Sequence, residues 1–169
     1  MKVITTVVGS LQTNCYLLID EKTNQAAVVD PGFLNDVLLN EIKKYTNCKK
    51  SADLFVKYHE LKDGELLEEY YDPFMEALAD DFNVPNALAI FDKLVKDLNN
   101  AIRQKQENLI SSLYFTFNRL HDIIGLKLET PTIDEEILKL YREFETLRLE
   151  KNYSEADKIR AILIEKKIL

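Results

Sequence analysis

Apolar residues recur at helical spacing from residue 66 to the end of the chain. They return every three or four positions, which is the period of one face of an α-helix. The five stripes are Leu66, Leu67, Tyr70, Phe74 and Leu78; Ala87, Phe91, Leu94, Leu98 and Ile102; Ile110, Leu113, Phe117, Leu120 and Ile124; Ile133, Ile137, Leu140, Phe144 and Leu147; and Ile159, Ile162 and Leu163. Because one-sided helices must bury their apolar faces against each other, we expect an antiparallel helix bundle.

Residues that begin or end helices stand between these stripes. Asn83 can cap the second helix, with Pro85 in its first turn, where the missing N–H has no partner in any case. Gly125 can end the third helix. Thr132 and Glu135 have the spacing of a capping box at the start of the fourth. The spacing of these signals supports separate helices joined by short turns.

The corner between the first two helices has the sequence Asp80-Asp81-Phe82-Asn83. The first helix is expected to stop near Asp81, and Phe82 is expected to pack into the corner. Two adjacent carboxylates at a helix end are normally solvated. We therefore interpret Asp80 and Asp81 as surface residues and not as a catalytic pair.

The first 32 residues have a different pattern. Three short runs rich in β-branched and apolar residues, MKVITTVV, CYLLI and QAAVV, are separated by turn-forming residues and predict a small β-hairpin or meander. Residues 35–45 fit a short helix with Asn35 as its cap. Residues 46–53 have no apolar periodicity and are predicted to form a linker.

The predicted fold class is therefore mainly α. It combines an antiparallel helix bundle with a small N-terminal β-hairpin or meander and a short helix. The expected organisation is a β-rich segment at 1–45, a linker at 46–65 and a helical bundle at 66–169. A chain of 169 residues is long enough to bury a core in one or two small domains.

Composition and charge narrow the class of protein. Hydrophobic residues make up 46% of the chain and charged residues 30%, which is typical of a globular protein. No apolar run is long enough to span a bilayer and the first residues lack a signal-peptide layout, so we expect a cytoplasmic protein with no membrane partner. The net charge of −7 argues against broad electrostatic capture of nucleic acid. Nine acidic residues stand in 60–82 against the single Lys62, however, so the C-terminal helices can still present a small basic surface.

Residues suited to metal binding or covalent catalysis are few. Cys15, Cys48, His59 and His121 are the soft ligand candidates, and their spacing fits no zinc pattern. The two cysteines are expected to be reduced thiols, one of them buried in a strand. Four isolated glycines cannot form a phosphate-binding loop. We therefore expect no cofactor and no metal.

A first resemblance concerns the N-terminal segment. LQTNCYLLI at 11–19, followed by AVVDPG at 27–32, resembles the opening strands of metallo-β-lactamase-fold hydrolases of the glyoxalase II type. In that family a later His-x-His-x-Asp-His run holds the zinc ions that activate water. The run does not occur here. The resemblance implies a truncated β-rich segment over about 1–45 and makes hydrolysis the least favoured alternative.

A second resemblance covers about 100 residues. FMEALADDFNVPNALA at 74–89 and LRLEKNYSEADKIR at 147–160 resemble the helical region that follows the catalytic core of cysteinyl-tRNA synthetases. The resemblance implies a non-catalytic tRNA-binding module, with cysteine tRNA as its partner. The His-x-Gly-His and Lys-Met-Ser-Lys-Ser elements of that family's catalytic half do not occur here. ATP and zinc would therefore be needed only by that separate half.

The resemblance also implies the residues of a binding site. In the family the last helical hairpin recognises the anticodon, and Arg148 falls where a base-contacting arginine stands. Tyr153 falls where the family usually has tryptophan, so its stacking face is smaller, and Asp157 falls where an acid can accept from a base amine. Lys151 and Arg160 complete the predicted tRNA-binding set. Unpaired bases are held by such aromatic, planar cationic and hydrogen-bonding groups.

Two alternatives remain open. Arg148 and Asp157 could instead form an interhelical ion pair with Tyr153 packing the corner, as surface ion pairs are common. The whole chain could also be a protein-interaction or vestigial fusion protein with no RNA role. In that case the exposed strands at its N-terminus could self-associate through their unpaired edges.

Overall fold

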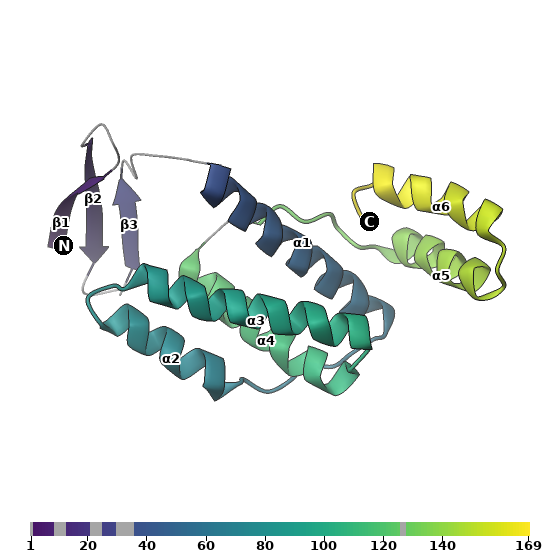
Figure 1. The fold of residues 1–169 in the computed structure, drawn as a ribbon, viewed down its shortest axis with the longest axis horizontal. Helices are drawn as coiled ribbons and strands as arrows, with labels where there is room; N and C mark the ends of the chain where they lie inside the picture. Colours follow the sequence, from purple (N-terminus) through teal and green to yellow (C-terminus); the bar gives the residue numbers. More distant parts are fainter. Residues whose placement is uncertain (1, 9–12, 21–24, 30–35, 126–127) are drawn as a thin grey trace. The chain divides into compact units, whose positions relative to one another are not determined.

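In a computed structural model the chain forms three strands and six helices over its described residues (Figure 1). The described residues are 2–8, 13–20, 25–29, 36–125 and 128–169. The elements are β1 (Lys2–Val8), β2 (Thr13–Asp20), β3 (Gln25–Val29), α1 (Asp36–Tyr58), α2 (Glu68–Ala79), α3 (Val84–Gln104), α4 (Glu107–Ile124), α5 (Glu135–Leu149) and α6 (Tyr153–Glu165). The chain divides into two compact units, residues 1–43 and 44–169. Of the helices described, none is both long and apolar enough to cross a bilayer.

The N-terminal unit contains an antiparallel sheet of order β1-β2-β3. Lys2 lies opposite Ile19, and Tyr16 lies opposite Val29. This is the small meander that the three apolar runs predict. β1 is an edge strand, and its Val3 side chain is exposed. Self-association through this edge stays a prediction. The expected turns at 9–10, 21–24 and 30–32 and the expected cap Asn35 lie outside the described residues.

Helix α1 corrects the predicted linker. Residues 46–53 are helical, and α1 continues to Tyr58 before the chain becomes extended. The apolar face of this part of the helix consists of Tyr45, Cys48 and Ala52, all of them buried. These positions are three and four residues apart, which is helical spacing. The spacing is hard to recognise in the sequence because cysteine and alanine are small and differ little in hydrophobicity from their polar neighbours. The buried cysteine is therefore Cys48 in a helix, and the side chain of Cys15 in β2 lies outside the description.

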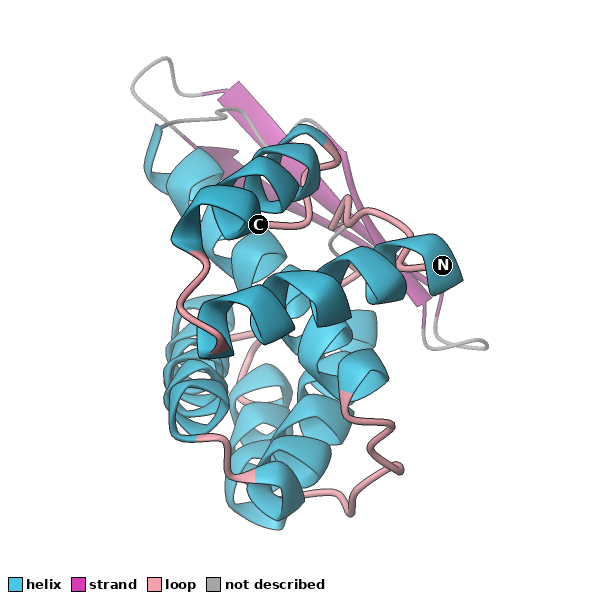
Figure 2. Cartoon of the chain, turned by 90° about the vertical axis from the view of Figure 1, so that its right-hand side faces the viewer, coloured by secondary structure: helices cyan, strands magenta, loops and turns pink. Residues whose placement is uncertain are grey.

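The first hydrophobic core joins α1 to the three helices that follow. Helices α2, α3 and α4 lie side by side (Figure 1). Figure 2 shows that helices form most of the chain. Phe74, Phe91 and Phe117 are fully buried, one from each of these helices. The Phe91 and Phe117 rings stack with centroids 5.0 Å apart. The predicted stripes of these helices are thus confirmed as core.

The last two helices do not close into that same bundle. They form a hairpin with a separate hydrophobic cluster, in which Ile137 and Phe144 of α5 pack with Ile159 and Leu163 of α6. Leu54 of α1 is buried in the same cluster. Amphipathic stripes show that a face is buried but not against which partner. The predicted fold class, a mainly α helix bundle, is confirmed. Helices α1 to α4 form its first helical layer, and α5 and α6 form a hairpin whose cluster also includes Leu54 of α1.

The predicted helix ends are confirmed in two places and wrong in a third. The Asn83 side chain accepts a hydrogen bond from the backbone N–H of Asn86, at 3.2 Å, and Gly125 ends α4 with φ +71°. The expected capping box at Thr132 does not form. Asp134 caps α5 instead, accepting from the N–H of Ile137 at 2.9 Å. With Asp134 as the N-cap, the preceding residue Ile133 is buried at the start of α5, in the position of a hydrophobic staple. This burial favours Asp134 over Thr132 as the cap.

The corner after α2 differs from the prediction for Phe82. Its side chain is 46% exposed and does not fill the corner. Asp81 and Phe82 both have positive φ, 52° and 57°, and the N–H of Asn83 bonds to the carbonyl of Ala77 at 3.0 Å. The chain thus turns through two left-handed residues, which directs Phe82 to solvent. Asp80 and Asp81 are exposed, as expected.

Candidate nucleic-acid interface

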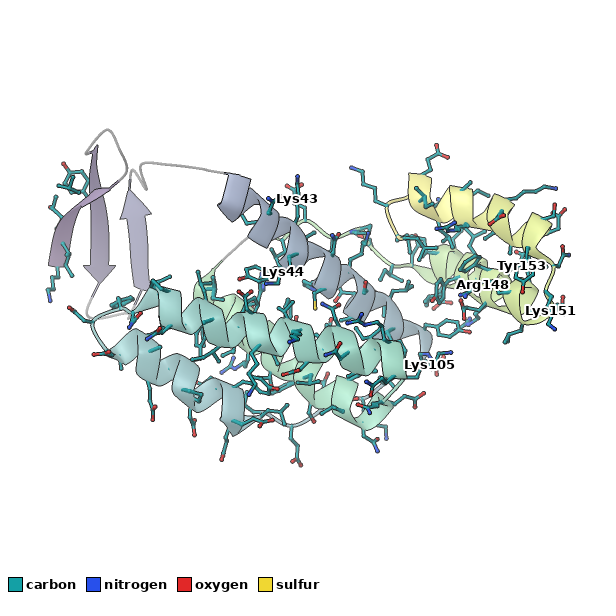
Figure 3. All side chains as sticks on the ribbon, viewed as in Figure 1. Lys43, Lys44, Lys105, Arg148, Lys151 and Tyr153 are labelled. Atoms are coloured by element: carbon teal, nitrogen blue, oxygen red, sulfur yellow. The ribbon has the colours of Figure 1, made fainter. Side chains whose placement is uncertain are left out.

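The turn between α5 and α6 places two of the predicted site residues beside each other. The N–H of Asn152 bonds to the carbonyl of Leu147 at 2.9 Å, and the N–H of Lys151 bonds to that of Arg148 at 3.2 Å. With Lys151 at φ 61° this is a Schellman motif. The motif reverses the chain within three residues. The last turn of α5, with Arg148, therefore faces the first residue of α6, Tyr153 (Figure 3).

Arg148 is exposed but held in place. Its Nη1 donates to Glu145 Oε1 at 2.9 Å, and its guanidinium carbon lies 5.4 Å from the centroid of the Phe144 ring. The side chain nevertheless stays 55% exposed. The ion pair of Arg148 is thus with Glu145 on its own helix. The alternative Arg148–Asp157 pair across the turn does not occur among the ion pairs of the described residues, where Arg148 pairs with Glu145 one helical turn away.

A groove of about 1010 Å³ runs between this hairpin and the first helical layer. Both of its walls belong to the unit formed by residues 44–169. One wall comes from α1 and the end of α3: Asn47, Lys50, Ser51, Leu54, Phe55, Tyr58, His59, Ile102 and Lys105. The other comes from the hairpin and the residues after it: Tyr141, Glu145, Arg148, Leu149, Tyr153, Ile168 and Leu169.

Aromatic rings form much of the groove surface. Phe55 and His59 stack with centroids 4.1 Å apart, and Tyr58 meets Tyr141 edge to face at 5.0 Å. Burial, followed by the negative charge of Glu145, raises the pKa of Tyr141 to about 12, so its phenol is neutral at physiological pH. Tyr153 is the most open of these rings, at 61% exposure. Flat aromatic faces next to solvent are suited to stacking against planar ligands.

Charge in the groove is opposite in sign to that of the whole chain. Lys50, Lys105 and Arg148 line it against one carboxylate, Glu145. Seven of the nine acidic residues of the 60–82 region lie elsewhere, exposed on α2 and beside it, while Glu60 pairs with Arg142 of α5 at 3.8 Å. Glu65, Glu68, Glu69, Asp72, Glu76, Asp80 and Asp81 form this exposed acidic set. A polyanion would therefore be repelled from the α2 face and attracted to the groove.

The structure separates the predicted site residues into two groups. Arg148 and Tyr153 line the groove together. Asp157 and Arg160 are exposed one and two turns further along α6, and Lys151 is exposed at the tip of the hairpin. These three do not belong to the groove lining that the described residues form.

Sequence reasoning missed the wall opposite the hairpin. Lys50 and Tyr58 lie on the part of α1 beyond the short predicted helix, and Lys105 follows α3. The spacing of Tyr45, Cys48 and Ala52 could have extended the predicted helix to this region. Nothing in the sequence pattern places α1 across from α5, because that contact is tertiary.

Two further reactive groups, Cys48 and His59, have polar partners within the protein. Cys48 Sγ lies 3.7 Å from the Val95 carbonyl, and burial raises the pKa of its thiol to about 12. A thiol in that state is a poor nucleophile. His59 Nδ1 lies 3.2 Å from Glu107 Oε1. No group of three or more metal-ligating side chains occurs among the described residues.

Comparisons with known proteins find a domain match and similar proteins for the helical part of the chain. A DALR domain matches residues 73–129. Over 100 residues the chain is 34% identical to a cysteine–tRNA ligase from Halalkalibacterium halodurans, covering 57% of this chain and 22% of that ligase. Over 141 residues it is 29% identical to a cysteine–tRNA ligase from Malacoplasma penetrans, covering 81% of this chain and 32% of that ligase. The chain thus spans about a fifth to a third of the length of these relatives.

The extent of these matches bears on α1. An alignment that covers 81% of the chain includes α1 to α4 wherever it begins. The predicted linker at 46–65 therefore lies inside the region that is similar to a ligase. The resemblance of residues 1–45 to metallo-β-lactamase-fold hydrolases is not tested by these matches and stays a prediction. The resemblance of the helical part is confirmed: residues 73–129 match a DALR domain, and the similar proteins are cysteine–tRNA ligases.

Proposed function

We propose that this chain is a non-catalytic module that binds the anticodon side of a tRNA, with cysteine tRNA as its partner. In this role it serves aminoacylation when joined to a catalytic domain. The observation that carries the proposal is the groove in which Arg148 and Tyr153, two residues of the family's hairpin motif, lie together with further aromatic rings. The ligase relatives support the choice of tRNA as the ligand.

The geometry of the hairpin suits an unpaired nucleotide. Tyr153 presents an open ring at the start of α6, against which a base can stack. Arg148 is oriented by Glu145 and Phe144 yet keeps free N–H groups. Its planar fork can then donate two parallel hydrogen bonds to a base edge or a phosphate. Because the guanidinium is held in advance, little side-chain freedom is lost on binding.

The charge distribution sets the expected affinity. A net charge of −7 opposes binding of a polyanion at long range, and only a few cations line the groove. We therefore expect a Kd in the micromolar range or weaker, with steep dependence on salt. A titration of the chain with cysteine tRNA and a non-cognate tRNA, each at two salt concentrations, tests the proposal. Equal and salt-independent signals for both tRNAs would count against it.

Arg148→Ala should weaken binding of cysteine tRNA by roughly 10- to 100-fold, the loss expected for one bidentate contact. Fluorescence anisotropy with labelled tRNA measures the change. Arg142→Ala is the matched control, because Arg142 is an exposed arginine of the same helix outside the groove lining. The proposal is wrong if both variants bind as tightly as the unchanged chain.

Tyr153→Trp should tighten binding by about two- to fivefold, because indole has a larger stacking face than phenol. The chain contains no tryptophan, so the variant also carries a single indole fluorophore. Its emission should be quenched as tRNA is added. Phe82→Trp provides the control, since Phe82 is exposed at the α2–α3 corner outside the groove lining. Quenching of both indoles, or of neither, would contradict a base stacked on residue 153.

A further inference from the structure

The groove has a second wall for which the hairpin motif gives no role. Lys50 on α1 and Lys105 at the end of α3 both line it, across from Arg148 and Tyr153. Figure 3 shows Lys105 at the end of α3 and Arg148 on α5. A volume of about 1010 Å³ is large for a single small-molecule site, which normally holds about 300–1,000 Å³. The groove can therefore admit more of an RNA strand than one base.

Lys50 differs from three of the other lysines on α1, namely Lys44, Lys49 and Lys57. Lys44 pairs with Asp92 at 2.6 Å, Lys49 pairs with Asp53 at 2.8 Å, and Lys57 donates to the Ile133 carbonyl at 2.8 Å. Within the described residues, Lys50 Nζ has neither an ion pair nor a hydrogen bond, and the same holds for Lys105 Nζ. These two ammonium groups thus remain available to an anion that enters the groove.

The backbone at Lys105 makes glycine a favourable replacement at this position. Lys105 has φ 54° and ψ 40°, the left-handed conformation. The N–H of Gln106 bonds to the carbonyl of Ala101 at 3.1 Å, so Lys105 occupies the position of a Schellman motif that glycine normally fills. A side chain there strains the backbone, while glycine does not. Exchanging Lys105 for glycine therefore removes the ammonium group without straining the end of α3.

We propose that Lys50 and Lys105 bind a backbone phosphate of the same unpaired RNA strand whose base stacks on the hairpin wall. This inference rests on the proposed tRNA-binding function and assigns the ligand of the opposite wall. The base lies between aromatic faces from both walls, and the two ammonium groups neutralise the phosphodiester next to it. Phosphate contacts position a strand without distinguishing its sequence. The α1–α3 wall therefore contributes affinity, and the hairpin contributes selectivity.

The test uses Lys105→Gly and Lys50→Gln in the full chain. Lys105→Gly should raise the Tm by about 2 °C, because the backbone strain is removed. The same change should weaken tRNA binding by roughly three- to tenfold and lower the slope of log Kd against log salt by about 1. Lys50→Gln should lower the slope by a similar amount. The loss should be equal for cysteine tRNA and a non-cognate tRNA, unlike the loss in Arg148→Ala.

Two control variants separate the contact from general effects. Lys62→Gln removes one positive charge from an exposed residue outside the groove lining and should leave binding unchanged within about twofold. Glu60→Gly relieves the same kind of left-handed residue at the end of α1, where φ is 53°, and should raise the Tm without weakening binding.

The outcomes distinguish this inference from the function on which it rests. Suppose that Arg148→Ala weakens tRNA binding, while Lys50→Gln and Lys105→Gly leave both the affinity and the salt slope unchanged. This result overturns the phosphate site alone. The phosphate site is also overturned if Lys62→Gln weakens tRNA binding as much as Lys105→Gly does. The loss of affinity would then come from the change in net charge. No binding of tRNA by the unchanged chain overturns both proposals.

Discussion

Gly64→Ala should lower the free energy of unfolding by about 3 kcal/mol, the upper part of the range for an overpacked site. A Cβ added at Gly64 would lie 2.2 Å from Ser112 N and 2.3 Å from Ser111 C. These are backbone atoms of α4, which cannot rotate away as a side chain could. The extended segment that follows α1 would have to move away from α4. Urea denaturation, followed by circular dichroism at the helix band, measures the loss.

Leaving α4 would also break hydrogen bonds that hold this segment. The N–H of Leu67 donates to Thr116 Oγ1 at 2.9 Å, and the N–H of Glu65 donates to Ser112 Oγ at 3.3 Å. Thr116 is fully buried, so its hydroxyl depends on partners within the protein. Amide hydrogen exchange at Leu67 should therefore accelerate in the variant.

Gly125 provides the comparison, because its substitution tests a different mechanism. A Cβ at Gly125 meets no atom within 4 Å, but the residue has φ +71°. Gly125→Ala should therefore destabilise by about 1 kcal/mol through backbone strain alone. If Gly64→Ala were no worse than Gly125→Ala, the close approach to α4 would not matter to stability.

Much of the fold follows from the sequence because its stripes are long. Helices α2 to α5 each repeat their apolar positions over several turns, and helix ends carry residues such as Asn83 and Gly125 with one clear role. The stripe of α6 is shorter: Ile159 and Leu163 are buried, but Ile162 is 40% exposed. The sequence pattern did not predict that α1 continues beyond residue 45, and the reason lies in the residue types of its buried face. Its buried face uses Cys48 and Ala52, whose residue types also occur in loops and give little contrast with polar neighbours.

The candidate site was predictable on one wall only. Arg148 and Tyr153 stand in a motif that is continuous in sequence, so a short turn is enough to bring them together. Lys50 and Lys105 are 55 residues apart, and both line the groove only because α1, through Leu54, packs into the cluster of the hairpin. Periodicity predicts which face of a helix is buried, but the partner depends on the shapes of all the faces together. Closeness in sequence is not sufficient either, because Asp157 belongs to the same motif as Arg148 and Tyr153 but lies outside the groove lining.

The packing of the first core predicts the largest single loss of stability. Phe91 is fully buried in the middle of α3. Its ring stacks on Phe117 at 5.0 Å and meets Tyr45 edge to face at 4.9 Å. It therefore joins α3 to α4 on one side and to α1 on the other. Because α1 also carries one wall of the groove, this ring supports the site from behind.

Phe91→Ala should lower the free energy of unfolding by about 3–5 kcal/mol, since it removes a buried ring and leaves a cavity between three helices. Phe82→Ala removes the same side chain from an exposed position and should change stability by less than about 1 kcal/mol. Urea denaturation of both variants measures the difference. Near-equal losses would show that α1, α3 and α4 do not share one packed core. In that event the α1 wall of the groove would have no rigid support, and the phosphate site at Lys50 would lose its structural basis.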